Sequence, residues 1–223
     1  MGKIAQDLRS IKARDPACRN IAEVVFLYSG FHALVNYRIS HFFYKHKLFF
    51  IARLLSQLSR FFTGIEIHPG ATIGRGLFID HGSGVVIGET AELGDECTLY
   101  QGVTLGGTGK NTGKRHPTLG NDVLVGAGSK VLGPVNIGSH AKIAAGAVVL
   151  HDIPRYATAV GVPARVVRIA NERVDDEIRN DDLDQTHVPD PIAQEFCRMG
   201  QEIAQIRSEL EKMRAEKKDG GNG

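Results

Sequence analysis

The sequence lacks the features that mark several classes of protein. It contains no tryptophan and only three cysteines, and Cys18, Cys97 and Cys197 are too widely spaced for a disulfide framework or a metal knuckle. The formal net charge is only +2, so no general attraction to nucleic acid or to an anionic membrane is expected. The sparse cysteines indicate a reducing compartment, and we expect a cytoplasmic protein.

Long apolar runs are also absent. Phenylalanines gather between residues 26 and 62, but lysine and arginine interrupt each run well short of the about 18–20 residues that a membrane-spanning helix needs. The N-terminal residues are polar and contain no apolar signal core. Apolar positions in residues 1–63 recur three and four apart, which predicts a domain of short packed helices that ends at Gly64.

A six-residue repeat occupies residues 64–168. One aliphatic residue in six is predicted to point inward, while glycine, aspartate or asparagine allows the chain to turn at each corner. Four positions after most of the aliphatic positions lies a small or β-branched residue, such as Ala71, Ser83 or Ala91. The pattern predicts a solenoid of short strands. The aliphatic positions are Ile67, Ile73, Ile79, Ile87, Leu93, Leu99, Leu105, Leu119, Val125, Val131, Ile137, Ile143 and Val149.

The residues after the repeat divide into three segments. Residues 169–190 are strongly acidic and are predicted to be a linker, residues 191–217 a helix, and residues 218–223 a disordered tail. Apolar residues in the helix alternate in spacing between four and three, as in a heptad seam. This pattern predicts a parallel coiled coil that clamps a trimer, and the alternative is a helix that folds back on its own chain. The seam residues are Ile192, Phe196, Met199, Ile203, Ile206, Leu210 and Met213.

The repeat is interrupted twice, and each interruption carries a histidine. The step from Ile79 to Ile87 is eight residues instead of six, and the step from Leu105 to Leu119 is fourteen. Since the inward positions must stay stacked, a solenoid places extra residues outside a corner. The first break therefore exposes Asp80 and His81, and the second forms a glycine-rich basic loop with Arg115 and His116. The two breaks are predicted to build a functional site.

At these breaks the chain resembles the serine O-acetyltransferase family. The matching segments are RDPA (14–17), IHPGATIGRG (67–76), IDHGSGVVIGETA (79–91), VTLGGTGK (103–110), RHP (115–117), GAGSKVLG (126–133) and GVPAR (161–165). The resemblance implies an α+β fold in which N-terminal helices precede a left-handed parallel β-helix with three hexapeptides to a coil. It also implies acetyl transfer from acetyl-CoA to the hydroxyl of L-serine in cysteine biosynthesis, with L-cysteine as a feedback inhibitor.

The resemblance assigns a role to the first histidine. His81 is the implied general base, because an unaided hydroxyl is a poor nucleophile and a neutral imidazole can take its proton. A carboxylate should orient the ring, and the family's aspartate corresponds here to Glu66. This replacement adds one methylene, and the alternative for Glu66 is an ordinary surface residue.

The resemblance also implies a site for the amino acid. Asp15 and Asp80 would hold the serine ammonium, and Arg115 and His116 would hold its carboxylate, which agrees with their charges. The alternative for Asp15 is a helix cap before Pro16.

For acetyl-CoA, the family's positions correspond to small residues and one lysine. Small side chains suit a flat groove for the pantetheine arm, and Lys142 could meet a CoA phosphate. The implied acetyl-CoA residues are Gly107, Thr108, Ala127, Lys142 and Ala145.

The resemblance implies a homotrimer without a metal. Long members carry a larger helical N-terminus that joins two trimers, and a C-terminal isoleucine that enters cysteine synthase. This chain has a short segment before RDPA and ends in Gly223, so neither a hexamer nor a cysteine synthase complex is expected.

Three other functions fit parts of the pattern. A metal-dependent carbonic anhydrase on the same solenoid needs three histidines around one ion, and the breaks supply only two. An acetyltransferase for a sugar or an antibiotic would not need Asp15 and Arg115. A non-catalytic scaffold would not need the breaks.

Overall fold

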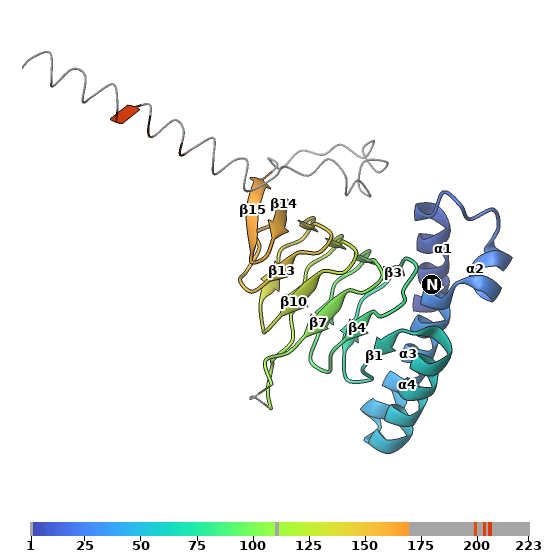
Figure 1. The fold of residues 1–223 in the computed structure, drawn as a ribbon. Helices are drawn as coiled ribbons and strands as arrows, with labels where there is room; N and C mark the ends of the chain where they lie inside the picture. Colours follow the sequence, from blue (N-terminus) through green and yellow to red (C-terminus); the bar gives the residue numbers. More distant parts are fainter. Residues whose placement is uncertain (1, 110–111, 170–198, 200–202, 204, 207–223) are drawn as a thin grey trace, which may run out of the picture. The chain divides into compact units, whose positions relative to one another are not determined.

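The computed structural model describes residues 2–109 and 112–169, together with 199, 203, 205 and 206. The chain divides into two units, Met1–Val188 and Pro189–Gly223. In the first unit, four helices precede a solenoid of short strands (Figure 1). In the second, Met199, Ile203, Gln205 and Ile206 are helical. The rest of the predicted coiled coil, the predicted linker beyond Ile169 and the tail lie outside the described residues.

The helices are α1 (Lys3–Arg14), α2 (Ile21–Leu27), α3 (Ser29–Lys45) and α4 (Phe49–Thr63). The side chain of Asn20 caps α2 by accepting a hydrogen bond from the Glu23 N–H at 3.0 Å. After α4 the chain turns at Gly64, which adopts a left-handed φ of +71°.

The strands form three sheets, one for each side of the solenoid, and each strand pairs in parallel with the strand one coil further along. Only β15 pairs antiparallel among the described strands, with β14. Sheet A contains β1 (Glu66–Ile67), β4 (Val86–Ile87), β7 (Thr104–Gly106), β10 (Lys130–Leu132) and β13 (Val148–Val149). Sheet B contains β2 (Thr72–Ile73), β5 (Glu92–Leu93), β8 (Thr118–Leu119) and β11 (Asn136–Ile137). Sheet C contains β3 (Phe78–Ile79), β6 (Thr98–Leu99), β9 (Leu124–Val125), β12 (Lys142–Ile143), β14 (Ala157–Gly161) and β15 (Ala164–Ile169).

The predicted aliphatic positions form the core of the solenoid. All thirteen belong to one buried cluster, and none is more than 4% exposed. Two of the small residues four positions further on, Ala71 and Ala91, are also buried. After the first break Ser83 is exposed, and Val85 is buried in its place. The two extra residues come before this position, so the inward register resumes two residues later.

The helices cover the first coil, where strands β1–β3 have no preceding coil to pair with (Figure 1). Ala33 and Leu34 of α3 join the solenoid core. The Tyr37 hydroxyl donates to the Ala71 carbonyl at 2.6 Å, Arg38 to the Ile73 carbonyl at 2.7 Å and the Ser56 hydroxyl to the Ile67 carbonyl at 2.8 Å. These bonds satisfy carbonyls that would otherwise form an open sheet edge.

The three corners of the coil differ. At the corner between sheets C and A, which we call the glycine corner, five glycines stack with φ between +69° and +73°: Gly64, Gly84, Gly102, Gly128 and Gly146. At the corner between sheets B and C, the side-chain corner, larger residues take the same left-handed turn with φ between +54° and +62°: Glu96, Asp122, His140 and Tyr156. The corner between sheets A and B, the loop corner, carries the long insertion between β7 and β8.

Candidate active site

Asp80 and His81 lie at the glycine corner, between β3 and β4. The N–H of Gly82 donates to the Asp80 carbonyl at 2.6 Å, and His81 takes a left-handed φ of +56°. This tight turn accommodates the two extra residues and leaves the His81 side chain 74% exposed, with its Nε2 atom 3.8 Å from Asp80 Oδ1. The imidazole is therefore accessible to a substrate.

Asp15, at the end of α1, belongs to the same group. Its carboxylate accepts hydrogen bonds from the Tyr28 hydroxyl at 2.5 Å and from the Ala17 N–H at 2.8 Å. Burial raises the pKa of Asp80, and the nearby charge of Asp15 raises it further, against the lowering effect of His81. Two neighbouring carboxylates that repel each other favour a bound ammonium group. The helix-capping alternative does not apply to α2, whose N-cap is Asn20.

Arg115 and His116 lie at the loop corner. His116 is 8% exposed, and its Nδ1 atom lies 3.2 Å from the Thr90 amide nitrogen and 2.9 Å from the Thr90 hydroxyl. The same hydroxyl accepts hydrogen bonds from the N–H groups of Arg115 and His116. Arg115 also forms an ion pair with Glu89 at 2.6 Å. Thr90 therefore anchors the end of the inserted loop.

Two glycines make room for the His116 ring. A Cβ atom at Gly88 would lie 1.9 Å from its Cδ2 atom, and one at Gly107 would lie 2.9 Å from its Nε2 atom. Burial lowers the pKa of His116, and the adjacent Arg115 charge lowers it further. The ring is thus fixed in place and favoured in its neutral form.

Sequence reasoning missed Glu89, Thr90 and Tyr44. Burial raises the pKa of Glu89, but hydrogen bonds from Arg115 and Tyr44 and the charge of His68 bring it below its ordinary value. An open hollow of about 370 Å³ adjoins these residues, lined by Tyr44, Gly70, Thr72, Glu89, Thr90, Ala91, Glu92 and Thr112. Because Glu92 pairs in register with Thr118, counting back one coil from Arg115 and His116 would have located Glu89 and Thr90.

Glu66 has other partners than His81. Its carboxylate forms ion pairs with Arg53 at 3.1 Å and with Arg60 at 2.9 Å, both on α4. Among the residues that the structure describes, Asp80 supplies the only carboxylate oxygen within 4.0 Å of a His81 ring nitrogen. The role of Glu66 as the orienting carboxylate stays a prediction.

The residues predicted to bind acetyl-CoA occupy two corners and a sheet. Ala127 and Ala145 directly precede the stacked glycines Gly128 and Gly146. A Cβ atom built on either glycine would meet no atom within 4 Å, so this part of the glycine corner is open. Lys142 is half-buried in β12 of sheet C. Gly107 and Thr108 are exposed at the start of the inserted loop, at the loop corner.

The predicted substrate residues form two separate groups within one chain. Asp15, Asp80 and His81 gather at the glycine corner, whereas Arg115 and His116 lie at the loop corner. Strand β4 runs between the two corners, and at about 3.3 Å per residue even Val85 to Gly88 covers ~10 Å, more than the length of an amino acid. Within one chain the two groups therefore lie at opposite ends of β4.

No group of three His, Cys, Asp or Glu side chains in residues 2–109 and 112–169 is arranged to hold a metal ion. No described helix is both long enough and apolar enough to cross a bilayer.

Comparisons with known proteins agree with this architecture. Residues 1–35 match the family described as "Serine acetyltransferase, N-terminal", and residues 116–151 match "Bacterial transferase hexapeptide (six repeats)". The serine acetyltransferase of Bacillus subtilis (strain 168) is 53% identical over 208 residues, which cover 93% of this chain and 94% of that protein. The chain belongs to the serine acetyltransferase family.

Solved structures of serine acetyltransferases have the same fold. One, in complex with cysteine, is 41% identical with a TM-score of 0.75 over 76% of this chain. Another, from Brucella abortus strain S19 in complex with coenzyme A, is 43% identical with a TM-score of 0.72 over 74% of this chain. The chain spans 66% of the length of each. The predicted fold, N-terminal helices followed by a left-handed parallel β-helix, is confirmed.

Proposed function

We propose that the protein transfers the acetyl group of acetyl-CoA to the hydroxyl of L-serine, which yields O-acetylserine and CoA for cysteine biosynthesis. The observation that carries this proposal is the exposed His81 side chain beside Asp80, at a break in the repeat of a serine acetyltransferase family member. A general base in this position can reach an acceptor hydroxyl that binds at the glycine corner.

The proposed reaction uses His81 as a proton shuttle. A ring nitrogen takes the serine hydroxyl proton while the serine oxygen attacks the thioester carbonyl carbon, and Asp80, 3.8 Å away, stabilises the imidazolium that forms. The tetrahedral intermediate then collapses, the carbon–sulfur bond breaks, and the imidazolium returns the proton to the departing CoA thiolate. Glu66 remains the predicted orienting residue.

Charge complementarity supports the proposed serine site. The carboxylates of Asp15 and Asp80 would bind the ammonium, and the Arg115 guanidinium would bind the carboxylate, to which the neutral His116 ring would donate a hydrogen bond. Since cysteine differs from serine only in the side-chain heteroatom, the same groups would bind L-cysteine, which would inhibit by competition.

A homotrimer would complete this site. Around a threefold axis, the glycine corner of one chain can face the loop corner of the next, and such a ring closes with three equivalent sites. The predicted coiled coil of residues 191–217 would hold three parallel C-terminal segments on the same axis. Neither a hexamer nor a complex with cysteine synthase is part of the proposal.

The acetyl-CoA arm would run along the open glycine corner. Ala127 and Ala145 would line it, Gly107 and Thr108 would approach from the neighbouring chain, and Lys142 would meet a phosphate. No metal is needed for this chemistry. We place the reaction in the cytoplasm, a location that the free thiols of Cys18 and Cys97 support.

One assay tests the proposal against acetyl transfer to another acceptor. CoA release from acetyl-CoA is measured across a panel of amino acids and sugars, with and without a metal chelator. The expected result is release with L-serine alone, unchanged by the chelator. Release with a sugar but not with serine would contradict the proposal.

A further inference from the structure

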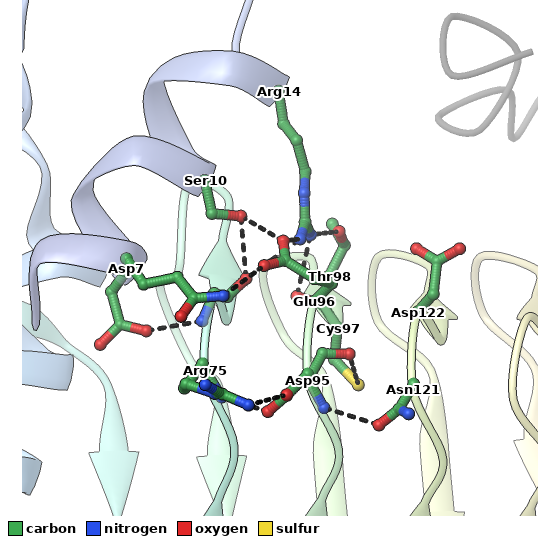
Figure 2. A network of polar contacts seen from close by, with 12 residues as sticks. Asp7, Ser10, Arg14, Arg75, Asp95, Glu96, Cys97, Thr98, Asn121 and Asp122 are labelled. Atoms are coloured by element: carbon green, nitrogen blue, oxygen red, sulfur yellow. Dashed lines mark hydrogen bonds and ion pairs between the residues drawn. The ribbon is translucent and has the colours of Figure 1, made fainter. Parts of the chain in front are cut away.

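Helix α1 is fastened to the β-helix by a polar network at the side-chain corner (Figure 2). Arg14 donates to the Thr98 hydroxyl at 2.8 Å, to the Cys97 carbonyl at 3.2 Å and to the Gly76 carbonyl at 3.1 Å. It also forms an ion pair with Glu96. The last residue of α1 is therefore tied to two successive coils at four acceptor groups.

Two further residues of α1 extend this network. The Ser10 hydroxyl lies 2.7 Å from Glu96 Oε2 and 3.1 Å from the Gly76 carbonyl oxygen, and Asp7 accepts the Gly76 N–H at 2.7 Å. Asp7, Ser10 and Arg14 are spaced three and four apart, so they share one face of the helix. Asp7 and Ser10 are buried. Directional bonds along a buried face fix both the rotation of α1 and its position along the solenoid.

The corner in which Glu96 lies directs its side chain toward Arg14 and Ser10 of α1. Glu96 has the left-handed φ of +60°, and a Cβ atom at Gly76, directly above it, would lie 2.2 Å from Glu96 Oε1. Because Gly76 has no side chain, the Glu96 carboxylate can occupy the space beside it. Asp122, one coil further and with the same turn, contacts His140 at 3.0 Å instead of α1.

Asp15 directly follows Arg14 and is a predicted ligand of the serine ammonium. We propose that Glu96 and Arg14 are positioning residues that hold the end of α1 so that Asp15 lies beside Asp80. This inference rests on the proposed function, since it assigns Asp15 to serine. Neither positioning residue touches the substrate. Their effect should therefore appear in serine affinity, and acetyl-CoA affinity should not change.

The test compares Glu96→Gly with Asp122→Gly. Both substitutions place glycine at a left-handed position where glycine is favoured, but only the first removes a contact with α1. We expect Glu96→Gly to raise the serine KM roughly 10-fold, and to weaken L-cysteine binding, measured by calorimetry, by a similar factor. The acetyl-CoA KM should stay unchanged. Asp122→Gly should match the wild type in all three values.

A second pair of variants tests the same contact from the helix side. Arg14→Lys keeps the charge but loses the fork of hydrogen bonds, so its serine KM should lie between those of the wild type and Arg14→Ala. Equal serine KM and cysteine affinity in the wild type, Glu96→Gly and Arg14→Ala would overturn the positioning role. A loss of kcat alone, which would indicate a smaller folded fraction, would overturn it as well. A wild type that releases no CoA with serine would instead overturn the proposed function.

Discussion

The glycine corner and the side-chain corner make the same left-handed turn, but the first is built from glycines and the second from residues with larger side chains. Five stacked glycines line the first corner, and Glu96, Asp122, His140 and Tyr156 take the equivalent positions along the second. Left-handed backbone is costly for most residues, yet the side-chain corner accepts it four times. Backbone geometry alone therefore does not require glycine at the glycine corner.

The difference lies in what covers each corner. At the side-chain corner the residues make contacts, Glu96 with Arg14 of α1 and Asp122 with His140. At the glycine corner, a side chain added at Gly128 or Gly146 would begin in open space, with no atom within 4 Å of its Cβ. His81 is the exception there, a left-handed residue with an exposed side chain. A bare corner with one projecting imidazole suits a bound cosubstrate, whereas a filled corner suits docking of the chain's own helix.

The largest expected effect comes from removing that imidazole. His81→Ala should lower kcat by ~10²–10⁴, because the serine hydroxyl loses its proton acceptor, while acetyl-CoA binding stays near normal. His140→Ala is the matched control, since His140 has a similar φ of +62° at the other corner, and it should keep wild-type turnover. Near-normal turnover of His81→Ala in a steady-state CoA-release assay would contradict the mechanism.

Arg115 tests whether the loop corner completes the site. Loss of a charged hydrogen-bond donor to the serine carboxylate should raise the serine KM by about 10- to 100-fold in Arg115→Ala, and cysteine inhibition should weaken in parallel. Lys114→Ala, which removes the neighbouring ion pair with Glu92, should leave both values close to wild type. A change in only one of the two constants of Arg115→Ala would contradict a shared site for serine and cysteine.

The same residue tests whether sites form between chains. Co-expression of His81→Ala with Arg115→Ala should restore roughly a quarter of wild-type activity, because random assembly of a closed ring pairs an intact glycine corner with an intact loop corner in about one site in four. No recovery in mixed trimers, with assembly checked by light scattering, would place both groups in one chain.

A smaller effect is expected from filling the bare corner. Ala145→Phe should raise the acetyl-CoA KM by about 10-fold and leave the serine KM unchanged, because the ring would occupy the proposed pantetheine groove. His151→Phe places the same ring at an exposed position elsewhere in the last coil and should change neither constant. An equal acetyl-CoA KM in both variants would mean that the glycine corner does not carry the cosubstrate.

The smallest effect concerns pH and a second histidine of the loop corner, the half-buried His68. Burial, together with the Arg53 charge, lowers the pKa of His68 in the folded protein. Since the unfolded chain then binds the proton more readily, folding stability should fall as pH drops below the ordinary histidine pKa of 6.5 and rise again above it. The melting temperature of His68→Gln should fall less between pH 7.5 and pH 5.5, by roughly 2 °C. Parallel melting profiles for the two proteins would contradict this linkage.

The sequence predicted the repeat well because the repeat is a local property. The inward position recurs every six residues whatever the rest of the chain does, so all thirteen positions could be located. The two breaks that carry Asp80, His81, Arg115 and His116 could be located as well. At the first break, the two extra residues move the small inward position of that turn from Ser83 to Val85.

Contacts between segments that are distant in the sequence could not be predicted from the repeat. These contacts depend on where helices and coils meet in space. They include the hydrogen bond from Tyr28 to Asp15 and the ion pairs of Arg115 with Glu89 and of Glu66 with Arg53 and Arg60. Spacing along the chain carries no information about these meetings. For the same reason the sequence did not predict that the two groups of substrate residues lie at different corners.

The sequence by itself thus determined the period of the solenoid, its buried positions and the places where it breaks, because each depends on residue types within one or two coils. Only the tertiary structure decided how α1 docks through Arg14 and Glu96, which corner stays bare, and how far His81 lies from Arg115. These features depend on the stacking of whole coils and on the helices that cover the first one, and no local pattern specifies either.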